Sequence, residues 1–153
     1  MKFKFYLGLV FFSMLNISFA NGKADMENMI RVMNKDNPEE YQAVLSNFIS
    51  SAKEENVKAM LELTSDITKN KMGVEALKTY FKKDAIPTIK ACKTISKGGD
   101  VIHIEKEQTG TGSGWVFRKT CMYGENKSIR LQFVILNENN NIVLTSVGLA
   151  PKK

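Results

Sequence analysis

The chain is poor in the residues that most often carry enzyme chemistry. Its 153 residues include one histidine, two cysteines, three prolines and one tryptophan. A single histidine and a cysteine pair that a disulfide would occupy do not favour a zinc site, and no Cys-x-x-Cys pair supports a thioredoxin-like redox role. A P-loop, a Gly-x-Ser-x-Gly elbow and a Ser-His-Asp set in recognisable context are also missing. The sequence therefore predicts neither a metal site nor a cofactor.

Long hydrophobic runs are missing apart from one near the N-terminus. Lys2 and Lys4 precede an almost unbroken apolar run over residues 5–12, and Ser18-Phe19-Ala20 supplies small residues at positions −3 and −1 of a cleavage site. These three parts form the pattern of a secretory signal peptide. An uncleaved anchor is the alternative, but polar residues end the run short of the roughly 20 residues that span a membrane. We therefore predict a signal peptide over residues 1–20 and export to the periplasm or the cell exterior, with no membrane contact after cleavage.

Arginine is absent from the most basic part of the chain, residues 67–97. This segment has eight lysines against two acidic residues, a net charge of +6, whereas residues 21–66 have five basic and nine acidic side chains, a net charge of −4. Arginine is the residue suited to bidentate phosphate recognition, and an exported protein rarely meets nucleic acid. The lysines could attract an anionic surface, but a solvated helix face is the favoured interpretation. We expect no nucleic-acid partner.

The two cysteines, Cys92 and Cys121, both lie downstream of the predicted cleavage site. An even count in an exported protein favours a disulfide, because the compartment permits oxidation. Two buried free thiols are the alternative. The disulfide would join the end of the helical region to the first strand of a hairpin. Closing a loop of this size stabilises a protein by about 3–4 kcal/mol in the chain-entropy model.

Helical periodicity dominates the first half of the chain. A short helix, frayed or partly ordered, is predicted over residues 21–36, ahead of a single domain over residues 37–150. Asn37 and Pro38 are typical of a helix N-terminus. Apolar residues then recur at i, i+3 and i+4 spacing as far as residues 54–56, which predicts an amphipathic helix.

Further helices are expected before residue 93. A second helix is predicted over residues 57–63, followed by a polar connector over residues 64–72 and a third helix from Gly73. Pro87 lacks the N–H that a helix interior uses, so we expect a break or kink there. A short helical continuation is predicted as far as Cys92.

The predicted N-terminal helix carries an apolar stripe. Met26, Met29, Ile30 and Met33 have helical spacing. Methionine side chains adapt to irregular or promiscuous surfaces, so this stripe could dock a partner or the mouth of the protein's own pocket. Packing of the helix on the body is the simpler interpretation.

From residue 100 the apolar period becomes that of a strand. A strand is predicted over residues 101–106, then a glycine-rich loop over residues 110–114. A phosphate-binding glycine loop opens a helix; this loop leads into a strand, so we interpret it as a hairpin connection. The final strand is predicted over residues 142–149.

Two β-like runs between residues 115 and 136 flank the turn at residues 123–127. Ile129, Leu131, Phe133 and Ile135 alternate on one face, the pattern of an antiparallel hairpin with one buried face. Helices followed by consecutive strands predict an α+β domain, with N-terminal helices packed on one face of a curved antiparallel sheet of about four strands.

This order of elements, with the segment T-Y-F-K-K-D-A-I-P at residues 79–87 and the strand G-W-V-F at residues 114–117, resembles the NTF2-like (cystatin-like cone) superfamily. It is most similar to small exported members of unassigned function. The resemblance implies that helices and a concave sheet enclose a cone-shaped pocket. It also implies that an enzyme of this type would carry an Asp–His or Tyr–Asp pair inside the cone, and the sequence reveals no such pair. Fold alone does not settle function.

The leading hypothesis is an exported, non-enzymatic binding domain. It would use its cone or its outer sheet face to bind a small apolar ligand or a protein partner. Aromatic side chains with polar handles suit a ligand pocket, although simple core packing explains the same residues. The predicted pocket residues are Tyr80, Trp115, Phe117, Tyr123 and Phe133.

Two other functions are considered. A small enzyme of the isomerase or hydrolase type would use His103 as base, Glu105 as its orienting group and Tyr123 as proton donor; a histidine at a surface or an edge strand is the simpler interpretation. An inhibitor- or immunity-like protein would bind one partner tightly and have an empty or filled-in cone. A homodimer through the outer sheet face is also predicted, on the basis of Val134, Leu136, Val143 and Val147.

Overall fold

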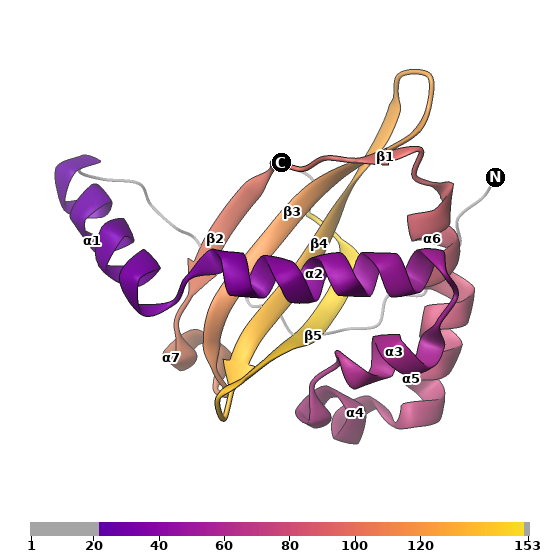
Figure 1. Cartoon of the computed structure of the whole chain (residues 1–153), viewed down its shortest axis with the longest axis horizontal. Coiled ribbons are helices and arrows are strands. Elements are labelled where there is room, and N and C mark those ends of the chain that lie inside the picture. Colours follow the sequence, from indigo (N-terminus) through magenta and orange to yellow (C-terminus); the bar gives the residue numbers. More distant parts are fainter. Residues whose placement is uncertain (1–21, 152–153) are drawn as a thin grey trace.

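A computed structural model describes residues 22–151 of the chain. It is an α+β structure in which helices are followed by a curled antiparallel sheet, as predicted (Figure 1). The predicted signal peptide lies outside the described residues. Within them, no helix combines the length and the hydrophobicity needed to cross a membrane. The helices are α1 (Gly22–Lys35), α2 (Pro38–Lys53), α3 (Val57–Glu62), α4 (Asp66–Met72), α5 (Val74–Tyr80), the π-helical turn η1 (Phe81–Ala85), α6 (Ile86–Ala91) and α7 (Lys106–Thr109).

The sheet is antiparallel throughout. Its strands are β1 (Thr94–Ile95), β2 (Asp100–Ile104), β3 (Ser113–Gly124), β4 (Lys127–Glu138) and β5 (Asn141–Leu149). The order is β1-β3-β4-β5, and β2 also pairs with β3. Because β1 pairs near Cys121 and β2 pairs from Gly114 to Arg118, the two lie end to end along one edge of β3. The five strands therefore fill four positions, as expected.

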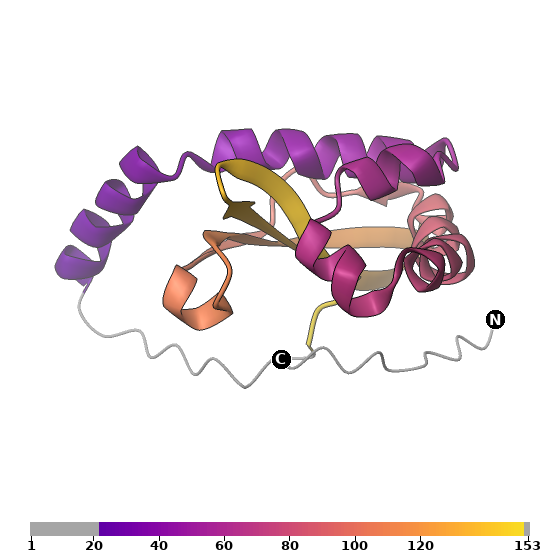
Figure 2. The ribbon, with the colours of Figure 1, turned by 90° about the horizontal axis from the view of Figure 1, so that it is seen from below.

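The β3–β4 hairpin is the centre of the sheet, which confirms the prediction from its alternating residues. Phe117 and Phe133 are paired across the two strands. Both side chains belong to the main core, together with residues of α2. Helix α2 lies across one face of the sheet (Figure 2). Helix α2 begins at a cap in which the Asn37 side chain accepts from the backbone N–H of Glu39. The cap satisfies one of the free N–H groups at the helix N-terminus. Pro38 in the first turn has the fixed φ angle that a helix requires.

The main core lies between the sheet and the helices. Phe48 of α2 contacts Phe81 at a ring separation of 5.6 Å and Phe133 at 6.4 Å, both edge to face. Such aromatic pairs contribute about 0.5–1.5 kcal/mol beyond the area that they bury. The core also contains Phe117, which exposes none of its surface.

A smaller apolar cluster lies on the outer face of the sheet, made of Ile104, Val116, Val134 and Leu136. Val134 and Leu136 each expose only 3%. Val147 faces the main core instead, because an irregularity in the β4–β5 pairing shifts the alternation of β5. Three of the four residues behind the predicted homodimer are thus buried or turned to the core, whereas Val143 lies on the outer face opposite Leu136. The homodimer itself stays a prediction.

The disulfide Cys92–Cys121 is present, as predicted, with the two Cα atoms 5.2 Å apart. It joins the residue after α6 to β3, close to the short pairing of β1 with β3. Both cysteines are buried in the main core. The disulfide therefore fixes the last helix of the helical region directly to the central strand of the sheet.

The expected polar connector at residues 64–72 is wrong in part, because residues 66–72 form α4. The helix has no buried residue, so its sequence shows no apolar stripe. It forms because the Ser65 side chain caps the backbone N–H of Thr68 and because Asp66 suits the positive end of the helix dipole. Thr68 also donates to the backbone carbonyl of Thr145 at 3.0 Å, which fixes α4 to β5.

The expected break at Pro87 takes the form of the π-helical turn η1, directly before α6. Proline cannot donate an N–H and crowds the carbonyl four residues earlier. A wider turn accommodates both effects without ending the helix. The short elements β1 and α7 were not predicted. The helix α7 follows the end of β2 at Ile104, so Glu105 is its N-cap and not part of a strand.

The outer edge of β5 is covered by the helical region. The backbone N–H of Leu144 donates to the carbonyl of Leu63, and the carbonyl of Leu144 accepts from the N–H of Ser65. Further along β5, the carbonyl of Val147 accepts from the Tyr80 hydroxyl at 2.7 Å. With the Thr68 bond to β5, these contacts occupy groups that an open strand edge would present to another chain.

Candidate functional site

Three of the predicted pocket residues lie in the packed core. Phe117 and Phe133 expose none of their surface, and Trp115 exposes 5%. A ring with no exposed surface touches no space that admits water. The concave face of the sheet at Phe117 and Phe133 is therefore filled by side chains, Phe48 of α2 among them.

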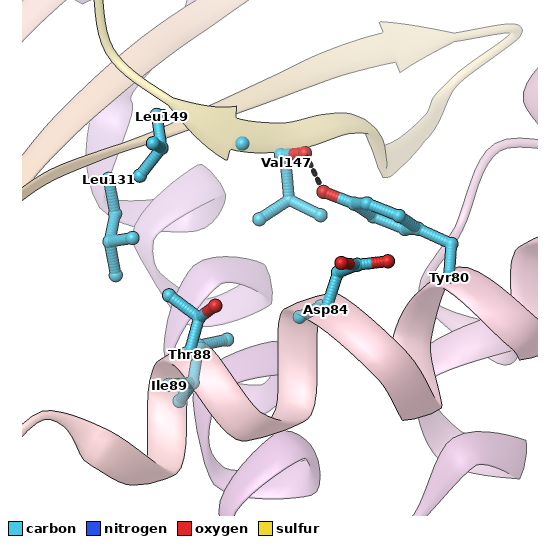
Figure 3. A pocket seen from close by; sticks show the side chains of 9 residues that line it. Tyr80, Asp84, Thr88, Ile89, Leu131, Val147 and Leu149 are labelled. Atoms are coloured by element: carbon cyan, nitrogen blue, oxygen red, sulfur yellow. Dashed lines mark hydrogen bonds between the residues drawn. The ribbon is translucent and has the colours of Figure 1, made fainter. Parts of the chain in front are cut away.

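Tyr80 does line a cleft, between the helices and the end of β5 (Figure 3). Its hydroxyl points across the cleft to the carbonyl of Val147, and Asp84 and Thr88 come from the same helical wall as Tyr80. The strand side of the lining includes the apolar residues Leu131 and Val147. Its enclosed volume is about 20 Å³, enough for about one water molecule. The cleft as it stands accepts at most one small apolar group.

Tyr123 does not line the cleft and lies far from His103. It is near the turn end of β3 and exposes 36% of its surface. His103 pairs with Trp115 near the other end of the same strand. Eight residues of strand separate Trp115 from Tyr123, a distance of about 26 Å. The structure therefore does not bring together the proton donor and the base of the predicted enzyme.

A polar cluster surrounds Asp36, one of the two residues between α1 and α2. One carboxylate oxygen, Oδ1, accepts from the Tyr41 hydroxyl at 2.5 Å. The other, Oδ2, accepts from the Ser113 hydroxyl at 2.9 Å and lies 3.2 Å from Nε2 of His103. The backbone carbonyl of Asp36 accepts from the indole N–H of Trp115 at 3.2 Å. Asp36 therefore joins the α1–α2 junction to β2 and β3.

The electrostatics of this cluster favour an ionised Asp36. Burial alone opposes the charge, but hydrogen bonds from Tyr41, His103 and Ser113 outweigh it and hold the pKa of Asp36 below its usual 3.8. Burial, together with the bond to Asp36, raises the pKa of Tyr41 well above its ordinary value. Tyr41 therefore remains a neutral donor and Asp36 a charged acceptor throughout the physiological range.

His103 is enclosed between two carboxylates. An ionised Asp36 is only an acceptor, so Nε2 of His103 must carry the proton in their contact. Nδ1 lies 3.4 Å from Oε1 of Glu105, the partner that the sequence predicted. The Trp115 ring contacts the imidazole edge to face at 4.8 Å, and the His103 side chain is only 15% exposed. A general base needs a free nitrogen next to its substrate, whereas here one nitrogen binds Asp36 and the other faces Glu105.

Sequence reasoning missed Asp36 and Ser113. They are separated by 77 positions, and Asp36 is 67 positions from His103. No local spacing connects these residues. The only available signal was that Asp36 directly precedes the helix cap at Asn37, where an acidic residue is unremarkable.

One cation is buried on the helix side of the sheet. Lys119 of β3 exposes 5% of its surface, and its ammonium donates to the backbone carbonyl of Lys97 at 2.6 Å. Burial lowers the pKa of Lys119. This carbonyl belongs to the loop between β1 and β2. The hydrogen bond from Lys119 therefore fixes that loop to β3, at the point where β1 and β2 leave the edge of β3 unpaired. Among the residues described, no group of three or more His, Cys, Asp or Glu side chains is placed to hold a metal ion.

Helix α1 presents a large apolar surface to solvent. Met26, Met29, Ile30 and Met33, hereafter the α1 stripe, expose 60%, 59%, 54% and 46% of their surfaces. The helix extends away from the rest of the molecule beyond β2 (Figures 1 and 2). Of the interpretations offered by the sequence, packing of this stripe on the body is therefore wrong.

No protein-family model matches this chain, and no curated protein or solved structure shows significant similarity to it. The NTF2-like resemblance therefore stays a prediction based on the order of elements. The function has to be argued from the filled concave face, the Asp36 cluster and the α1 stripe.

Proposed function

We propose that this protein is an exported, non-enzymatic domain of the NTF2-like type that binds a protein partner through its surface. The observation that carries the proposal is the filled concave face, where Phe117 and Phe133 expose none of their surface. Pockets for small molecules typically measure 300–1,000 Å³, whereas the cleft beside Tyr80 encloses about 20 Å³. The binding site is then expected on the outer surface of the protein, where a macromolecular partner has room.

The exposed apolar surface supports the same conclusion. Soluble domains rarely leave contiguous apolar patches of several hundred Å² without a function, and the four side chains of the α1 stripe each expose about half of their surface. The disulfide Cys92–Cys121 fits an oxidising compartment, in line with the predicted signal peptide.

A small enzyme is the second candidate, and the Asp36 cluster is the observation that favours it. The NTF2-like resemblance implies an Asp–His or Tyr–Asp pair in its enzymes, and Asp36 contacts both His103 and Tyr41. The hydrogen bonds of the cluster, however, connect parts of this protein to one another. Both oxygens of Asp36 are used by Tyr41, Ser113 and His103, which fix the α1–α2 junction. This geometry supports a structural role better than a catalytic one.

Native mass spectrometry of the protein purified from the exported fraction tests the proposal. We expect a chain lacking residues 1–20, with no small-molecule adduct and with a stoichiometric protein complex under gentle conditions. A retained adduct of small-molecule mass would contradict the proposal and support a ligand carrier or an enzyme. A chain that keeps residues 1–20 would contradict the proposed cleavage and favour an uncleaved anchor.

A further inference from the structure

We propose that α1 is the segment that binds the partner, by seating the α1 stripe in an apolar groove of another protein. This inference rests on the proposed function and names the site and the kind of partner. Met26, Met29, Ile30 and Met33 stand at positions i, i+3, i+4 and i+7. This is the anchor spacing of helices that dock into grooves.

The helix is exposed but held in place. The backbone N–H of Asp36 continues the helix by donating to the carbonyl of Val32 at 2.8 Å, and Val32 packs against the main core. Directly after α1, the Asp36 side chain is fixed by Tyr41, Ser113 and His103. The C-terminal end of α1 is thus anchored while the stripe remains open. A pre-positioned helix loses less conformational entropy on binding than a free peptide.

A second copy of α1 is a poor occupant for the stripe. The four side chains together present on the order of 400 Å² of apolar surface, the size of a functional patch. Two such helices packed face to face would bury about 800 Å² in total, which is the size of a crystal contact and below the 1,200 Å² of a stable specific interface. A groove encloses the flanks of a helix as well as its stripe and so reaches the larger area.

The residues beside the stripe also argue against a lipid surface. Helices that lie on membranes carry lysine and arginine on the polar face and Trp, Phe or Leu on the apolar one. Helix α1 has three basic and two acidic residues, a net charge of only +1, so it is not rich in basic residues. The acidic Glu27 follows Met26 and borders the stripe. The stripe is mainly methionine, which adapts to the shape of a protein groove. Charge complementarity with Glu27 predicts a lysine or arginine on the rim of that groove.

Site-specific photocrosslinking in the cells that express the full-length chain tests this inference. Benzoylphenylalanine is placed at Met29 or Met33 on the stripe, and at Asn28 on the opposite face as the matched control. We expect one protein adduct of the same mass from positions 29 and 33, and none from position 28. An adduct of twice the chain mass would show a second copy, and a lipid adduct would show a membrane; either result would overturn the proposal.

The partner that crosslinking identifies is then purified, and its affinity for this protein is measured. Because the stripe is exposed, Met29→Asp leaves the fold intact, which a thermal melt checks. We expect Met29→Asp to weaken binding at least tenfold, as truncation of a central anchor does, and Glu27→Lys to slow association and alter its salt dependence. Asn28→Asp should leave the affinity unchanged. Equal losses from positions 28 and 29 would refute a one-sided helix contact.

The two proposals fail in distinguishable ways. Crosslinks to a protein from Val101 on β2 or from Tyr123, but none from the α1 stripe, would refute the role of α1 and leave the protein-binding function standing. The absence of protein adducts from all of these positions, combined with a small-molecule adduct in native mass spectrometry, would refute both.

Discussion

Asp36→Asn is the most informative single substitution in this protein. Asparagine has nearly the same shape as aspartate but replaces one carboxylate oxygen by an NH2 group, and it has no charge. Donors approach both oxygens of Asp36, Tyr41 on Oδ1 and the pair Ser113 and His103 on Oδ2. Whichever way the amide is oriented, its NH2 group faces at least one of these donors. A donor that faces the NH2 group must turn into an acceptor or lose its bond, and every bond that remains loses its charge assistance.

The expected loss of stability follows from the number and type of these bonds. A hydrogen bond to a charged group contributes about 1.5–3 kcal/mol, and bonds within one network are not additive. We expect Asp36→Asn to lower the free energy of unfolding by about 3 kcal/mol at pH 7. For a domain of this size, that corresponds to a decrease in Tm of about 10 °C.

The pH dependence gives a sharper test than the loss itself. The pKa of Asp36 is lower in the folded protein than its usual 3.8. Between the folded and unfolded pKa values the unfolded chain binds more protons, so stability rises with pH in that window. The contribution of Asp36 is present above pH 4 and is lost as the pH falls through the folded-state pKa. Asparagine does not titrate, so the difference between the two proteins should shrink as the pH falls below 3.8 towards the folded-state pKa.

Urea unfolding of both proteins at pH 7, 5, 3 and 2, with the disulfide intact, measures this difference. Asp66→Asn is the matched control, because Asp66 is 88% exposed and forms a surface ion pair with Lys69. It should cost less than about 1 kcal/mol. A loss at Asp36→Asn that stays constant down to pH 2, or one no larger than the control, would refute the reasoning.

Three further outcomes are expected. Tyr80→Phe removes the hydrogen bond to Val147 and should lower the free energy of unfolding by about 1 kcal/mol. Because burial raises the pKa of Tyr80 to about 12, this stabilisation is complete below pH 10 and disappears as the pH rises from 10 to 12. Urea unfolding of both proteins in alkaline buffers checks this. Replacing Cys92 and Cys121 together by alanine should lower the free energy of unfolding by about 3–4 kcal/mol; an unchanged denaturation midpoint would contradict this. The mass of the exported chain should correspond to a start at residue 21, lighter by two hydrogens than after reduction.

The sequence predicts the elements whose apolar pattern is long. The alternation from Ile129 to Ile135 establishes β4, and the amphipathic run after Pro38 establishes α2, because burial of one face repeats over several turns or pleats. The same reasoning could not find α4. Its residues bury nothing, and a cap at Ser65 with the Thr68 bond to β5 holds it in place. The alternation of β5 predicted Val147 on the outer face of the sheet. It lies on the helix side, because the pairing of β5 with β4 is irregular beside Val134.

The candidate site was harder to predict than the fold. His103 and Glu105 could be paired because they are two residues apart. Asp36 approaches His103 only once α2 has packed across the sheet, and nothing in the sequence near Asp36 records that contact. Exposure of the α1 stripe was equally hidden, because an amphipathic pattern shows that a helix has an apolar face and not what covers that face.

The covered edge of β5 has a consequence for how the chain assembles. The groups that close this edge, at Leu63, Ser65, Thr68 and Tyr80, are all synthesised well before β5. Strand β5 pairs with β4 on one edge and bonds the helical region on the other, so it joins the two parts of the molecule through its backbone. A chain that ends before residue 141 would therefore leave both the β4 edge and these helical groups open, and an open strand edge is a substrate for aggregation, chaperones and proteases.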